Sequence, residues 1–221
     1  AERQLYVYDS PEYVKDMGTP DRYYSVEGDI KSGLVEKRNL SVKQKAVFLD
    51  RDGTINKYVG FLKDIDHFEL IDGVAQAVRM INRSGYLAIV ITNQPVIARG
   101  EVSWEELEEI HNKMETLLGN SGAYIDDIFC CPHHPDQGFA GERKEYKKVC
   151  ECRKPKPGLL LQAAQKYNID LGNSWMAGDS MGDMEAGRRA GCKVVYLGDE
   201  KAEGELTAPN LLEGIKLILA L

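Results

Sequence analysis

The stretch that decides the fold is AVFLDRDGT at residues 46–54, where a short apolar run ends in two aspartates, Asp50 and Asp52. The run has the length and character of a buried strand. Two carboxylates so close together repel each other, and a divalent hard cation such as Mg²⁺ would answer that repulsion. A plain strand-to-turn junction is the alternative, because Asp-Gly is common in turns.

Further apolar runs on both sides of this stretch predict more strands, separated by helices. Strands are expected at residues 46–50, 86–92, 174–179 and 193–198, with a weaker candidate at 124–132. Helices are expected at 72–85, 103–122, 157–168 and 181–191. Strands that alternate with helices in this way predict an α/β fold with a doubly wound parallel sheet. We expect this domain at residues 45–221, after an N-terminal extension at residues 1–44.

Polar residues stand at the ends of several of the predicted strands. Asp50, Asp52, Thr92 and Asp179 all occupy such positions. In doubly wound sheets, ligands bind at the carboxyl ends of the strands, so these four side chains are expected to converge on one crevice.

Composition excludes some classes of function. The 221-residue chain has a net charge of −7, with acidic and basic residues mixed along it. That balance disfavours a nucleic-acid binder, which needs a basic surface. No apolar stretch is long enough to cross a membrane, and the first residues do not resemble a signal peptide, so we expect a cytoplasmic protein.

A cysteine- and histidine-rich loop at residues 130–152 predicts a second metal site. Cys131 and His133 form one close pair, and Cys150 and Cys152 form another. Three thiolates and one imidazole suit a closed tetrahedral zinc site with a structural role. Free reduced thiols and a redox role are alternatives, and His134 could replace His133. An odd total of five cysteines argues against a disulfide framework, and Cys130 is left without an assigned role.

Four motifs in order resemble the haloacid dehalogenase superfamily of phosphohydrolases. They are DRDGT at 50–54, Thr92-Asn93, RKPKPG at 153–158 and GDSMGD at 178–183. The resemblance implies that Asp50 attacks phosphorus and that Asp52 is the general acid and base. It also implies that Thr92 and Lys154 hold the phosphoryl oxygens, although Lys154 taken alone would be read as a solvated surface lysine. Mg²⁺ would be held by Asp50, the carbonyl of Asp52 and Asp179, with Asp183 orienting its waters or Lys154.

The cysteine loop, together with the TNQ and IARG sequences at 92–94 and 97–100, resembles heptose-bisphosphate phosphatases and the related histidinol-phosphate phosphatases. The long segment between the two metal-ligand pairs favours the heptose enzymes, which act on a small phosphorylated sugar. Asn93, Gln94, Arg99 and Arg153 are then candidates for holding the sugar or its second phosphate. Two departures put the anomer preference in doubt. Pro95-Val96 replaces the usual Ser-Gly, and Ser180 stands where many members have lysine.

Two further readings of the function stay open. A polynucleotide 3′-phosphatase shares the aspartate motif but is opposed by the acidic balance, and the chain could also be a non-catalytic, zinc-stabilised interaction domain. The segment at 55–91 has room only for a short loop, a helix and a strand, and the segment at 94–152 contains a helix, a possible strand and the cysteine loop, so we expect a protein without a cap domain. Residues 8–33 resemble the C-terminal end of a sugar-phosphate nucleotidyltransferase, with a helix from Pro20 to about Gly33. This suggests a fused or associated nucleotidyltransferase, and an unrelated helical extension is the alternative.

Overall fold

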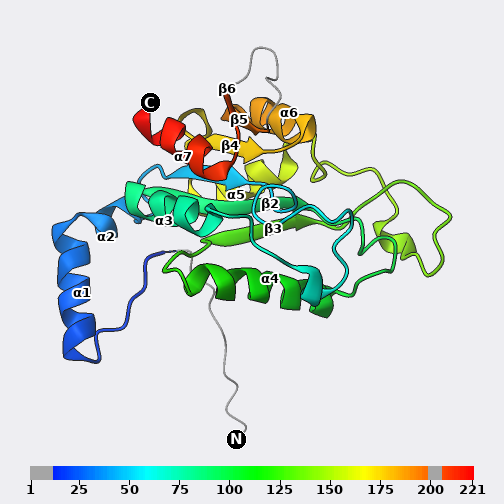
Figure 1. The fold of residues 1–221 in the computed structure, drawn as a ribbon. Coiled ribbons are helices and arrows are strands. Elements are labelled where there is room, and N and C mark those ends of the chain that lie inside the picture. The colour runs from blue at the N-terminus through cyan, green and yellow to red at the C-terminus, as the bar shows by residue number, and fades with distance from the viewer. Residues whose placement is uncertain (1–11, 199–205) are drawn as a thin grey trace, which may run out of the picture.

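The computed structural model describes residues 12–198 and 206–221, and its centre is a six-stranded sheet with the order β3-β2-β1-β4-β5-β6 (Figure 1). Every neighbouring pair of strands is parallel. The strands are β1 (Lys45–Leu49), β2 (Tyr86–Asn93), β3 (Asp127–Cys131), β4 (Trp175–Gly178), β5 (Lys193–Leu197) and β6 (Leu206–Ala208). The predicted doubly wound α/β fold is therefore confirmed, including the weaker strand candidate that became β3.

Helices cover both faces of the sheet, and alternate residues of β1 face the two layers. Val47 and Leu49 pack with the helices of one face, whereas Ala46 and Phe48 pack with those of the other. The first layer contains α3 (Val74–Ser84), α4 (Trp104–Gly119) and α7 (Leu211–Ala220). The second contains α5 (Gly158–Tyr167) and α6 (Met181–Ala190). Burial of β1 on both faces explains why its sequence is continuously apolar.

Local signals set several helix boundaries. Ser103 accepts a hydrogen bond from the backbone N–H of Glu106, and the Glu106 side chain accepts one from the Ser103 N–H, so α4 begins with a capping box. Gly85 ends α3 with a φ of 84°, a left-handed conformation that glycine adopts without a steric cost. Helix α7 and the three-residue strand β6 were not predicted from the sequence. Within the predicted N-terminal extension, Leu34–Lys37 form the short helix α2.

The strand order indicates where on the sheet a ligand site is expected. β1 lies between β2 and β4, and the chain runs outward from β1 in both directions. The connections after β1 and β4 therefore leave on opposite sides of the sheet, which opens a crevice between the carboxyl ends of these two strands. Asp50 directly follows β1 and Asp179 directly follows β4, so both flank that crevice.

The described residues before β1 lie near the end of the sheet where the strands begin. Helix α1 (Pro20–Lys31) projects from the domain beside α2, far from the long loop that follows β3 (Figure 1). An ion pair of 2.6 Å joins Arg38 to Asp126, and both side chains are about nine-tenths buried, at 11% and 10% exposed. Residues 1–11 of the predicted extension lie outside the described part. Among the described helices, none combines the length and apolar character needed to cross a membrane.

Candidate active site at the strand ends

A cavity of about 390 Å³ opens where the sheet's central strands end. Its walls come from the loop after β1, the end of β2, the start of α6 and the segment before α5. The lining residues are Asp50, Asp52, Tyr58, Gly60, Phe61, Leu62, Asn93, Gln94, Lys154, Asp179, Ser180, Gly182 and Asp183. The cavity thus brings together residues from four separate sequence motifs. It includes Asp50, Asp52 and Asp179 of the strand-end prediction, but Thr92 is not part of its lining.

Lys154 is the cation at the centre of this cavity wall. Its Nζ lies 2.5 Å from Asp50 Oδ1 and 2.6 Å from Asp183 Oδ1, and it donates to the carbonyl of Ile91 at 2.8 Å. Burial opposes its charge, but the two carboxylates outweigh burial and raise the pKa of the ammonium. A solvated surface lysine, the reading of Lys154 in isolation, is wrong because the residue is 7% exposed.

The carboxylates outnumber this one cation. Asp50, Asp179 and Asp183 each place a carboxylate oxygen within 4.8 Å of the others. Burial raises the pKa of Asp50 to about 7, with Asp183 and Asp52 adding to the rise and Lys154 opposing it. Burial and Asp183 likewise raise the pKa of Asp179. Three hard oxygen donors, two of which pair with Lys154, fit a divalent hard cation, which would compensate the remaining negative charge.

Gly53 allows the loop after β1 to come up against this cluster. Its φ is +87°, and a Cβ at this position would lie 2.0 Å from Asp179 Oδ2. Any side chain would therefore displace the Asp179 carboxylate. The glycine after the aspartate pair is required by the close approach of the two loops as well as by its backbone conformation.

Asp52 is held quite differently from Asp50. The Arg51 Nη2 donates to both of its carboxylate oxygens at 2.9 Å, and Arg51 Nε donates to Oδ1 at 3.2 Å. Asn56 Nδ2 donates to the same Oδ1 at 3.0 Å, and Gln94 Nε2 donates to Oδ2 at 2.8 Å. The two aspartates of the opening motif therefore do not share one partner: a lysine holds Asp50 and an arginine holds Asp52.

The predicted phosphate and substrate residues at the end of β2 mostly bond within the protein. Gln94 Nε2 also donates to Thr92 Oγ1 at 2.8 Å, which places the buried Thr92 one side chain back from the cavity. Asn93 donates from Nδ2 to the carbonyl of Lys154 and accepts from its N–H, both at 3.1 Å. Asn93 and Gln94 line the cavity, but their contacts also fix Lys154 and Asp52.

Arg99 and Arg153 lie outside the lining of this cavity. The Arg99 guanidinium stacks between the rings of Phe61, at 4.0 Å, and Phe139, at 4.5 Å. Phe61 is part of the cavity wall, so Arg99 contacts that wall through the Phe61 ring. Arg153 donates to the carbonyl of His133 at 3.3 Å and lines a second cavity of about 350 Å³ beside the cysteine loop.

Ser180, where the sequence departs from the usual lysine, has a clear local role. It is the N-cap of α6, and its hydroxyl donates to Asp183 Oδ2 at 2.6 Å. Its backbone N–H donates to the same oxygen at 3.1 Å. The capping box therefore directs the other oxygen of Asp183 toward Lys154. A lysine at this position would lack the hydroxyl that makes the cap.

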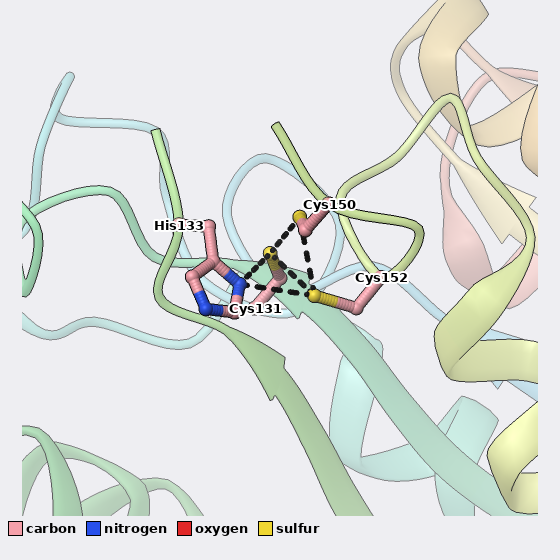
Figure 2. Close-up of side chains that lie close together, drawn as sticks. All are labelled: Cys131, His133, Cys150 and Cys152. Carbon is pink, nitrogen blue, oxygen red and sulfur yellow. Dashed lines mark hydrogen bonds between the residues drawn. The ribbon is translucent and has the colours of Figure 1, made fainter. Parts of the chain in front are cut away.

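The predicted zinc ligands form one compact cluster (Figure 2). The Sγ of Cys152 lies 3.1 Å from that of Cys131 and 3.3 Å from that of Cys150, and the remaining pair of sulfurs is 3.6 Å apart. His133 Nδ1 lies 3.2 Å from the Cys152 sulfur and 3.7 Å from the Cys131 sulfur. The edges of a zinc tetrahedron with Zn–S bonds of about 2.3 Å are about 3.8 Å long, so the cluster has nearly the size that the ion needs.

Two contributors to the site were missed by sequence reasoning. Arg51, which stands between the two aspartates, was assigned no role, yet it is fully buried and binds Asp52. His111 of α4 lies with Nε2 3.2 Å from Arg51 Nη1. A basic residue between two acidic ones is a signal that could have identified Arg51. No local signal marks His111, which is 60 residues away in the chain.

The sheet topology and the strand-end aspartates define a class, the capless hydrolase domain of the haloacid dehalogenase type. A sequence profile described as HAD-hydrolase-like matches residues 151–211. The D-glycero-beta-D-manno-heptose-1,7-bisphosphate 7-phosphatase of Yersinia pestis is 42% identical over 174 residues, covering 77% of this chain and 90% of its own. The enzyme of the same name from Pasteurella multocida is 39% identical, covering 78% and 99%.

A solved structure of an enzyme with a closely related name is also similar to this chain. The D,D-heptose 1,7-bisphosphate phosphatase of B. bronchiseptica, crystallised with magnesium and phosphate, has a TM-score of 0.70 and 31% identity, covering 80% of this chain and 99% of its own. The chain belongs to the heptose-bisphosphate phosphatase family of the haloacid dehalogenase superfamily.

Proposed function

We propose that this protein is a Mg²⁺-dependent phosphomonoesterase that removes the 7-phosphate of D-glycero-D-manno-heptose 1,7-bisphosphate in the synthesis of nucleotide-activated heptose. The observation that carries the proposal is Lys154, which lies between Asp50 and Asp183 in the wall of a polar cavity. The names of relatives that are about 40% identical support the substrate. Histidinol phosphate is the alternative substrate.

In the proposed first step, a carboxylate oxygen of Asp50 attacks phosphorus in line. The bond between phosphorus and the sugar oxygen breaks, and Asp52 gives that oxygen a proton. In the second step Asp52 takes a proton from water, whose oxygen attacks the phosphorus of the aspartyl phosphate and releases Asp50 and inorganic phosphate. The two aspartates have different partners, which supports separate roles for Asp50 as the nucleophile and Asp52 as the general acid and base.

The phosphoryl oxygens need positive charge and donors around them. Lys154 supplies one charge, and Thr92 is a donor at the end of β2. Mg²⁺ would be held by Asp50, the carbonyl of Asp52 and Asp179, and when bound it would neutralise charge on the phosphoryl group. Asp183 orients Lys154, with which it forms an ion pair of 2.6 Å. Asn93, Gln94, Arg99 and Arg153 remain the candidates for contacts with the sugar and its second phosphate.

Zn²⁺ is the proposed occupant of the cysteine cluster. Cys131, His133, Cys150 and Cys152 would fill all four positions of a tetrahedron, so no position is left for substrate. Such a site would fix the loop that carries Arg153, which directly follows Cys152. The proposed role is structural, and metal analysis of the purified protein, prepared without a chelator, should give one zinc per chain.

The substrate can be tested by measuring phosphate release from three compounds. They are the α anomer of heptose 1,7-bisphosphate, its β anomer, and histidinol phosphate. We expect the heptose bisphosphates to have the higher kcat/KM, and dependence on added Mg²⁺. A higher kcat/KM for histidinol phosphate would select the alternative. Absence of phosphate release from all three compounds would favour the reading as a non-catalytic interaction domain.

We further propose that the extension at residues 1–44 contacts a sugar-phosphate nucleotidyltransferase, either fused or separate. Its resemblance to the end of such enzymes supports this, as does α1, on which Tyr23, Tyr24 and Ile30 are exposed by more than half. Analytical ultracentrifugation of the chain with a heptose-phosphate nucleotidyltransferase should detect a complex. Loss of that complex in a variant with Tyr23, Tyr24 and Ile30 replaced by serine would support the proposal, and no complex with the unaltered chain would contradict it.

A further inference from the structure

His111 meets the site through a residue that is itself completely buried. Arg51 is 0% exposed, and its guanidinium uses Nε and Nη2 to bind Asp52. The remaining nitrogen, Nη1, lies 3.2 Å from His111 Nε2. The guanidinium is thus held at one end by a carboxylate and at the other by an imidazole, and the imidazole comes from a helix on the flank of the domain.

The chemistry of this contact fixes the state of the imidazole. A guanidinium can only donate hydrogen bonds, so His111 Nε2 must accept, and the ring proton must lie on Nδ1. Burial and the neighbouring Arg51 charge lower the pKa of His111 to about 4, against a smaller opposing effect of Asp52. The ring is therefore neutral at physiological pH and can act as the acceptor.

We propose that His111 is a positioning residue for Asp52, acting through Arg51. Its imidazole fixes the rotation of the guanidinium, which in turn fixes the carboxylate that faces the cavity. Without this acceptor, Nη1 becomes a buried donor with nothing to bind, and the guanidinium turns to satisfy it. Asp52 then moves with its partner. This inference rests on the proposed function, in which Asp52 passes a proton to the leaving oxygen.

The leaving group separates a positioning role from a purely structural one. In an enzyme with a covalent intermediate, kcat/KM reports only the steps up to the departure of the first product. A sugar alkoxide needs a proton from Asp52 at that step, whereas p-nitrophenolate is a good leaving group and needs little help. Misplacement of Asp52 therefore affects the two esters unequally, while partial unfolding lowers both equally.

The test uses the full chain with Mg²⁺ and compares kcat/KM for heptose 1,7-bisphosphate and p-nitrophenyl phosphate. For His111→Leu and for His111→Asn, whose side chain is too short to reach Arg51, we expect a loss of about 10- to 100-fold on the sugar ester. The loss on the aryl ester should stay within about twofold. His111→Gln, which keeps an acceptor at a similar reach, should retain most of the sugar-ester activity.

Asn112→Ala is the matched control, since Asn112 is the exposed neighbour of His111 on α4. It should leave both rates unchanged. Equal losses on the two esters for His111→Leu and His111→Asn, or no loss on either, would overturn the positioning role. If the unaltered enzyme releases phosphate from neither ester, the proposed function itself fails, which is a separate result from an active enzyme that is indifferent to His111.

Discussion

The strand-end carboxylates and the cysteine cluster are both groups of potential metal ligands, but they are built in opposite ways. Asp50, Asp179 and Asp183 are hard oxygen donors that line an open cavity, and two of them, Asp50 and Asp183, pair with Lys154. The cysteine cluster has four soft or borderline donors that point at one another, as Figure 2 shows. An open oxygen site suits a cation that meets substrate, whereas a closed sulfur site suits a cation that holds a loop. Changes in the two clusters should therefore have separable effects.

The largest effect is expected for Asp50→Asn. The amide is a poor nucleophile toward phosphorus, so phosphate release should fall by at least about 1,000-fold. Zinc content should stay at that of the unaltered protein, because the cysteine cluster is untouched. A phosphate-release assay with metal analysis on the same sample checks both points, and turnover near the original rate would refute the proposed nucleophile.

The substitution Cys150→Ser removes one ligand of the cysteine cluster. We expect loss of zinc and a fall in the free energy of unfolding of about 2 kcal/mol or more, since metal binding contributes to folding. Activity on p-nitrophenyl phosphate should fall less than activity on the sugar bisphosphate, because the loop carries Arg153. Urea denaturation and metal analysis measure the effect. The matched control is Cys192→Ser, because Cys192 is a buried cysteine outside the cluster. This variant should have the zinc content of the unaltered protein.

Magnesium should stabilise the protein through the carboxylates alone. At a Mg²⁺ concentration about 100 times its Kd, linkage predicts about 2.7 kcal/mol of added stability. Asp179→Asn should remove most of this gain, and Cys150→Ser should keep it. Thermal unfolding with and without Mg²⁺ checks the prediction. An equal gain in Asp179→Asn would place the cation elsewhere.

The smallest effect concerns pH. The pKa of His111 is about 4 in the folded protein and about 6.5 when unfolded, so between these values the unfolded chain binds the extra proton. Stability therefore falls as the pH drops from about 7 to 5, by about 1–2 kcal/mol from this group. The fall should be smaller by that amount in His111→Gln. Denaturation of both proteins across this range gives the difference directly, and parallel curves would contradict it.

The sequence predicts the parts of this molecule whose signals are local. The apolar run before Asp50 indicates a strand buried on both faces. The spacing of the two metal-ligand pairs predicts one cluster from the sequence alone, formed by Cys131, His133, Cys150 and Cys152. The helix expected at residues 103–122 is α4, and the local signal at its start is the capping box of Ser103 and Glu106.

Contacts between distant segments could not be predicted in this way. Nothing near His111 indicates that it meets Arg51, and nothing near Arg99 indicates that two phenylalanine rings enclose it. Polar residues assigned to substrate, such as Gln94, bond to other active-site groups because a buried amide needs partners within the protein. Helix α7 was missed although it packs into the core. The assigned roles of the site residues stay predictions until the experiments above are done.

The Arg38–Asp126 ion pair has a consequence for how the molecule can be approached. It anchors the end of α2 beside Asp126, which directly precedes β3, whereas the cavity lies where the strands finish. Helix α1 projects from the domain beside α2 (Figure 1). A protein attached at α1 would therefore meet the domain near the beginning of the sheet, at the end opposite to the cavity.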